Sequence, residues 1–115
     1  MARIIAFVPD LLFGSTVLGM ISAAGHDGVL ASDLAVARID GADGLIIDLT
    51  ADPADRLEAV ASALAEHRVP TLAFYSHVEA DVRAMAEESG IDVVVPRSRM
   101  AREGGALIER LITPG

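Results

Sequence analysis

The feature that most constrains the fold is an alternation of short apolar runs and longer segments with helical spacing. The runs are rich in β-branched residues and are typical of buried strands, and each is followed by a helix-like segment. The expected strands are 3–8, 28–31, 44–48, 70–75 and 91–95, and the expected helices are 11–24, 33–39, a helix that begins at Pro53, 78–89 and 102–112. Five consecutive strand–helix units result.

Such an alternation with short connections requires a parallel sheet with helices on both faces, because the crossovers are right-handed. We therefore predict an α/β fold, a three-layer flavodoxin-like sandwich whose five strands lie in the order 2-1-3-4-5. Punctuation residues support the helix boundaries: Asp10 and Asp52 stand at N-cap positions, Pro53 at a first helical position, and Gly25 after the first helix.

Composition narrows the class of protein further. The chain has 115 residues, 52% of them hydrophobic, and no cysteine, which suits one domain spanning 1–115 without disulfides. A net charge of −8 would repel a nucleic-acid backbone, so no nucleic-acid partner is expected. Residues 11–24 are too few to cross a bilayer, and Pro9 and Asp10 interrupt the apolar stretch. We therefore expect neither a signal peptide nor membrane binding. A cytoplasmic domain is expected instead.

In a doubly wound sheet the functional crevice lies beyond the carboxyl ends of the strands, beside the point where strand order reverses. The polar and charged residues expected at those ends are Asp10, Asp48, Thr50, Tyr75, Ser76, His77 and Arg97. The predicted topology therefore gathers the candidate site residues at one edge of the sheet.

The five-unit layout, Asp48 in I-I-D-L at the end of the third strand, and Arg97 in V-P-R-S after the fifth strand resemble the receiver domain of bacterial response regulators over nearly the whole chain. This resemblance implies that Asp48 is the phosphoacceptor and that Asp10 and Asp48 hold Mg²⁺. It also implies that Ser76 or Tyr75 contacts the phosphoryl group and that Arg97 neutralises its charge.

The sequence departs from the receiver pattern at the metal site and the basic position. Receivers carry two adjacent acids where this chain has Val8 and Pro9, which leaves a weak Mg²⁺ site, and they carry a lysine where it has Arg97. An ungapped alignment from Arg97 also places Tyr75 rather than Ser76 at the hydroxyl position. The chain is therefore interpreted as a divergent receiver or pseudo-receiver, a stand-alone signalling or protein-interaction domain with a degenerate phosphoacceptor site.

Simpler roles stay open for the same residues. Asp48 would end a strand in water or pair with Arg97, and Thr50 would be a loop residue. Ser76 would open a capping box with Glu79. In a second class of function, the crevice binds a small anion or ligand or catalyses a reaction, with His77 transferring protons and Arg97 clamping an anion.

The partner is expected to be a protein. Leu11, Leu12 and Leu18 lie off the core-facing side of the first helix, so helix 11–24 is a candidate surface for a homodimer or for docking. The rival surface is the face formed by 78–112. No output domain is expected after the last helix, so a signal would pass by contact, and a purely structural homo-oligomer subunit is the third class.

Overall fold

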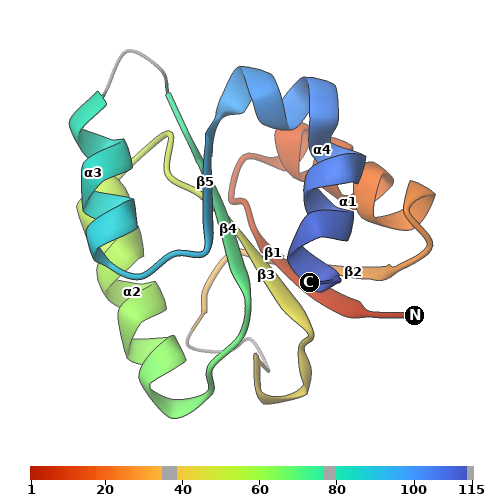
Figure 1. The fold of residues 1–115 in the computed structure, drawn as a ribbon, viewed down its shortest axis with the longest axis horizontal. Coiled ribbons are helices and arrows are strands. Elements are labelled where there is room, and N and C mark those ends of the chain that lie inside the picture. The colour runs from red at the N-terminus through yellow and green to blue at the C-terminus, as the bar shows by residue number, and fades with distance from the viewer. Residues whose placement is uncertain (35–38, 77–79, 114–115) are drawn as a thin grey trace.

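The computed structural model describes residues 1–34, 39–76 and 80–113. Its centre is a parallel five-stranded sheet in the order β2-β1-β3-β4-β5, which confirms the predicted order (Figure 1). The strands are β1 (Arg3–Phe7), β2 (Asp27–Ala31), β3 (Gly44–Asp48), β4 (Thr71–Tyr75) and β5 (Val93–Pro96).

Helices cover both faces of this sheet. In Figure 1, α1 and α4 lie on one side of the strands and α2 and α3 on the other, as expected for a three-layer α/β sandwich. The elements are α1 (Leu11–Ala23), α2 (Pro53–Glu66), α3 (Ala80–Glu88) and α4 (Arg97–Ile112), with a 3₁₀ turn at Ile39–Gly41.

Alternating side chains of the strands fill two separate cores. In β3, Ile46 packs with residues of α1 and α4, whereas Leu45 and Ile47 pack with residues of α2. All five β3 residues are buried, as a central strand covered on both faces requires. This is why the strands read as continuous apolar runs in the sequence.

The boundaries of α1 follow from local chemistry. Asp10 is the N-cap, and its carboxylate accepts hydrogen bonds from the backbone N–H groups of Leu12 and Phe13. Gly25, just past the helix, adopts φ +87°, a left-handed conformation that glycine reaches without a Cβ penalty. Both predicted signals for this helix are confirmed.

Two helix predictions differ from the structure. Most of the helix predicted over 33–39 falls in 35–38, which lie outside the described residues, and its last residue, Ile39, begins a 3₁₀ turn. The last helix begins at Arg97 rather than Arg102, because Pro96 ends β5 with extended backbone and leads directly into helical residues. A kink at Glu103 (φ −123°, ψ 19°) interrupts this longer helix where the prediction had placed its start.

Two side chains behave differently from expectation. Asp52 is the N-cap residue of α2, as predicted, but its side chain makes no capping hydrogen bond and its backbone is left-handed (φ 46°, ψ 49°). Leu18 is not off the core, because it is partly buried against the α1 and α4 core cluster. Leu11 and Leu12 are exposed as expected. No helix in the described part of the chain is long and apolar enough to cross a membrane.

Candidate functional site

The carboxyl ends of the parallel strands meet at one edge of the sheet, and the connections that leave this edge carry most of the predicted site residues. Asp48 is the last residue of β3 and pairs in register with Phe74 of β4. Arg97 follows β5 directly, and Asp10 follows β1 by three residues. His77 lies outside the described residues.

Asp48 is buried, with only 3% of its surface exposed. Its Oδ1 accepts hydrogen bonds from the backbone N–H of Thr50 (2.8 Å) and from the Thr50 hydroxyl. Its Oδ2 lies 3.7 Å from Nη1 of Arg56. Thr50 is therefore more than a loop residue, because it satisfies one oxygen of a buried carboxylate.

Arg56 is the site residue that the sequence reasoning missed. Its Nη1 donates a 2.8 Å hydrogen bond to the Asp48 carbonyl oxygen, and its guanidinium lies 6.0 Å from the centre of the Phe7 ring. Its side chain is only 15% exposed. A signal was present, since Arg56 stands four residues before buried Val60 and therefore on the inward side of α2. Arg56 is also a cation in the first turn of α2, where the helix dipole disfavours positive charge.

The conformation of the β3–α2 loop brings these groups together. Asp52 adopts the left-handed conformation, which is uncommon outside glycine, although aspartate and asparagine tolerate it best. Asp52 then leads into Pro53, and its carbonyl accepts the N–H of Arg56 at 3.0 Å. This tight turn returns the chain over the end of β3 and places Arg56 beside Asp48.

Arg97 does not pair with Asp48 in the structure, so that predicted pairing was wrong. Its Nη2 lies 4.0 Å from Oδ2 of Asp10, and its guanidinium stacks 4.2 Å from the centre of the Phe13 ring. The reason is that α4 starts at Arg97 and carries this side chain toward the beginning of α1. Asp48 and Arg97 thus belong to two different charge pairs.

A depression of about 670 Å³ lies between these pairs, lined by Phe13, Thr50, Ser76, Arg97, Ser98 and Ala101. Ser76 is half-buried on its wall, whereas Tyr75 is 6% exposed and belongs to the core cluster on the α2 and α3 side. Of the two candidate hydroxyls, Ser76 is the one that lies with Arg97 around this depression. Its predicted partner Glu79 lies outside the described residues.

The residues present do not fit Mg²⁺ well. A hard divalent cation needs several free oxygen ligands. Asp10 uses one carboxylate oxygen as the α1 cap and turns the other toward Arg97, while both oxygens of Asp48 face Thr50 or Arg56. Among the described residues, no group of three or more histidine, aspartate and glutamate side chains could hold a metal ion. Arg56 beside Asp48 and Arg97 beside Asp10 already supply the positive charge that a metal ion would bring.

The chain was compared with known proteins. No family model matches this sequence, and no curated protein matches it. Solved structures do match. A response regulator receiver domain protein from Clostridium thermocellum is 13% identical, with a TM-score of 0.82 over 97% of this chain and 94% of that one. The non-phosphorylated receiver domain of HemR from Leptospira biflexa is 20% identical, with a TM-score of 0.79 over 100% and 97%.

Two further matches show how widely this fold is used. NtrX from Brucella abortus is 19% identical with a TM-score of 0.84; the match covers 96% of this chain but only 26% of NtrX. A putative pilus assembly-related protein from Burkholderia pseudomallei is 18% identical with a TM-score of 0.78, over 97% and 90%. At these identities the matches define the fold and leave the chemistry to the residues themselves. The chain has the fold of response regulator receiver domains.

Proposed function

We propose that residues 1–115 form one receiver-like domain that acts by binding a protein partner and whose phosphoacceptor site is degenerate. The receiver fold supports a signalling role. Here the Asp48 carboxylate serves as one half of an internal ion pair. A cytoplasmic location is part of this proposal.

The observation that carries the proposal is the engagement of both Asp48 oxygens. A carboxylate that attacks a phosphoryl donor needs an accessible oxygen and a cation that neutralises the transferred group. Asp48 has a 5% exposed side chain, two bonds from Thr50 on one oxygen and Arg56 beside the other. The aspartate therefore stabilises the β3–α2 loop instead of reacting.

The test is the intact mass of the protein after incubation with acetyl phosphate and Mg²⁺, beside an ordinary receiver domain as positive control. Phosphoryl transfer to a carboxylate would release acetate and add about 80 Da. We expect no gain for this chain. A gain that disappears in Asp48→Asn would overturn the proposal and make Asp48 a working acceptor.

A second function is favoured by the depression beside Arg97. Arg97 and the hydroxyls of Ser76 and Ser98 around it are suitable donors for a small anion. If this is the function, inorganic phosphate should raise the melting temperature of the protein but not that of Arg97→Gln. Equal melting with and without phosphate would exclude this use of the depression for phosphate.

The proposed partner surfaces are helix 11–24 and the face formed by 78–112, which would serve a homodimer or another protein. Exposed Leu11 and Leu12 support the first, because adjacent large apolar side chains on a surface commonly mark an interface. A purely structural homo-oligomer would use the same surfaces without any ligand in the crevice. Mass at increasing protein concentration tests the homodimer and the homo-oligomer.

A further inference from the structure

Two leucines stand exposed at the start of α1. Leu11 is 73% and Leu12 is 85% exposed, and among the described large hydrophobic residues only Met1 and Val29 are also exposed. The helix that carries them, Leu11–Ala23, contains no charged residue. A partner that covers these side chains would remove their apolar surface from water, which favours association.

One arginine of α4 lies beside this pair, and two more follow it in the same helix. The guanidinium of Arg97 contacts Asp10 and Phe13, the residues on either side of the two leucines. Arg99 and Arg102 follow in the first two turns of α4 and share one acid, Glu103. All three arginines are at least 41% exposed. We call the surface formed by Leu11, Leu12, Arg97, Arg99 and Arg102 the leucine–arginine corner.

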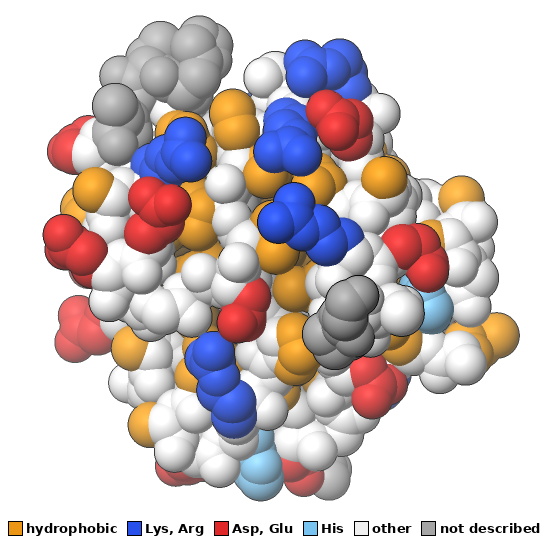
Figure 2. Space-filling model, in the orientation of Figure 1, with side chains coloured by type: hydrophobic (Ala, Val, Ile, Leu, Met, Phe, Trp, Pro, Cys, Tyr) orange, Lys and Arg blue, Asp and Glu red, His pale blue; other side chains and the backbone are white. Residues whose placement is uncertain are grey.

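The corner carries a local excess of positive charge, since its three arginines face two carboxylates, Asp10 and Glu103. The whole chain has a net charge of −8. Figure 2 shows the blue side chains concentrated over α4, while the flank over α2 and α3 shows more red than blue. A partner for the corner therefore needs an apolar recess with acidic edges.

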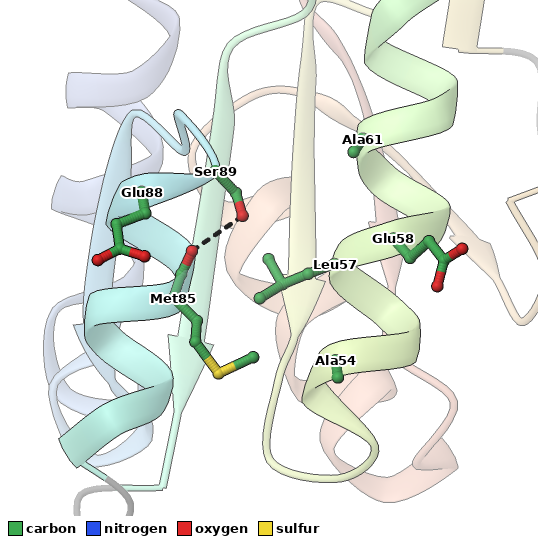
Figure 3. Close-up of a pocket in the computed structure, with 7 residues that line it drawn as sticks. All are labelled: Ala54, Leu57, Glu58, Ala61, Met85, Glu88 and Ser89. Atoms are coloured by element: carbon green, nitrogen blue, oxygen red, sulfur yellow. Dashed lines mark hydrogen bonds between the residues drawn. The ribbon is translucent and has the colours of Figure 1, made fainter.

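The opposite face of the sheet offers such a recess. A groove of about 350 Å³ lies between α2 and α3 (Figure 3). Leu57 and Met85 extend into the space between the helices, and Ala54 and Ala61 line the α2 side. Glu58 and Glu88 extend outward at the edges of the groove. Ser89 also lines the groove, and its hydroxyl donates to the Met85 carbonyl at 2.8 Å. We call this recess the α2–α3 groove.

The charge around the groove is strongly negative. The exposed acids of the two helices are Asp55, Glu58, Glu66, Asp81, Glu87 and Glu88. Against them stands one exposed arginine, Arg83, which is 3.6 Å from Glu87, because Arg56 is turned inward to Asp48. The groove and the corner are thus complementary in both polarity and charge.

We infer that the leucine–arginine corner of one copy docks into the α2–α3 groove of a second copy of this chain. The inference rests on the proposed function, according to which the domain acts by binding a protein, and it identifies that protein as a second copy of the chain. Corner and groove lie on opposite faces of the sheet, so the contact is heterologous and generates a ring or an open row of copies. A two-fold contact through α1 would instead bring two positively charged corners together, which is unfavourable.

The test uses one variant for each surface. Leu11→Ser with Leu12→Ser removes the corner anchors but leaves the groove, and Ala61→Arg blocks the groove but leaves the corner. All three positions are exposed, so the fold should survive, and melting curves check this. The matched controls are Ala59→Arg, exposed on α2 but outside the groove, and Val29→Thr, an exposed apolar residue on β2. If either test variant fails to fold, Leu12→Gln and Ala54→Arg replace them.

Sedimentation velocity is then measured over a concentration series. We expect the wild type and both controls to gain mass as concentration rises up to about 1 mM, the range in which weak interfaces dissociate. Each test variant alone should associate at least about tenfold more weakly, as loss of a central apolar anchor predicts. A mixture of the two variants should give dimers that stop at two chains, because only one intact corner and one intact groove remain.

Three results would overturn the inference: a wild type that stays monomeric, a mixture that stays monomeric, or an Ala61→Arg variant that associates like the wild type. The last would indicate a two-fold contact through α1. The outcome is independent of the phosphorylation test. Assembly with a labelled Asp48 would refute only the degenerate site, and a monomer with an unlabelled Asp48 would refute only the docking.

Discussion

Replacing Arg56 with methionine tests whether the buried pair at the end of β3 stabilises the protein. Methionine keeps the apolar stem over Phe7 but removes the guanidinium. The 2.8 Å hydrogen bond to the Asp48 carbonyl and the 3.7 Å ion pair to Oδ2 are then both lost. The Asp48 carboxylate, 5% exposed, is left without a cation.

The expected cost follows from the burial of the two groups. Removing one partner of a buried pair costs about 3–5 kcal/mol. Here the Arg56 side chain is 15% exposed and Thr50 still bonds to Asp48, so we expect the lower end, about 3 kcal/mol. For a domain of 115 residues this lowers the melting temperature by roughly 10–15 °C.

The measurement is thermal and urea unfolding of Arg56→Met beside Arg83→Met. Arg83 is 55% exposed and pairs with Glu87 along one helix, so its loss should cost only about 0.5 kcal/mol. The double variant Arg56→Met with Asp48→Asn should recover at least about 1 kcal/mol, because no uncompensated charge remains. Equal unfolding of Arg56→Met and Arg83→Met would refute the argument that this pair is structural.

Two further substitutions follow from local packing. In α4, Gly104→Ala should destabilise the protein by about 1–2 kcal/mol, because the added Cβ would overlap Sδ of Met20. Gly105→Ala has open space around it and should stabilise the protein by about 0.5–1 kcal/mol. Urea unfolding gives the sign of each change, and equal free energies of unfolding for the two variants would contradict the packing argument. Thr50→Val keeps the shape but removes the hydroxyl bond to Asp48, so unfolding should become easier by about 1.5 kcal/mol, and no change would mean that water replaces the hydroxyl.

The sheet was predictable because a parallel sheet buried on both faces leaves continuous apolar runs in the sequence. The run 44–48 is the clearest case, since all five of its residues are buried and its predicted bounds match β3. The strand order then followed from the handedness of the crossovers. The predicted start of α4, Arg102, was too late. The buried stripe of that helix begins earlier, at Met100, and the prediction left this residue out.

The partner of Asp48 was harder to predict than its position. Sequence spacing placed Asp48 and Arg97 at the same edge of the sheet, and opposite charges at one edge suggested a pair. The actual pair depends on the left-handed backbone at Asp52, which turns α2 so that Arg56 points inward. A single left-handed residue is set largely by the surrounding structure, so the sequence did not indicate this turn. The spacing of Arg56 from Val60 placed it on the inward side of α2 but did not name Asp48 as its partner.

The internal pair also bears on how a domain of this kind would be regulated. A phosphoryl group switches a protein only if it favours one of two conformations over the other. Under the proposed function Asp48 stays paired to Arg56, so no such charge would be added and the surfaces that the domain presents would stay constant. If the leucine–arginine corner docks into the α2–α3 groove of another copy, assembly then depends on protein concentration through mass action. Regulation would therefore lie in how much of the chain is present, and Arg56→Met should not change its self-association at concentrations where it remains folded.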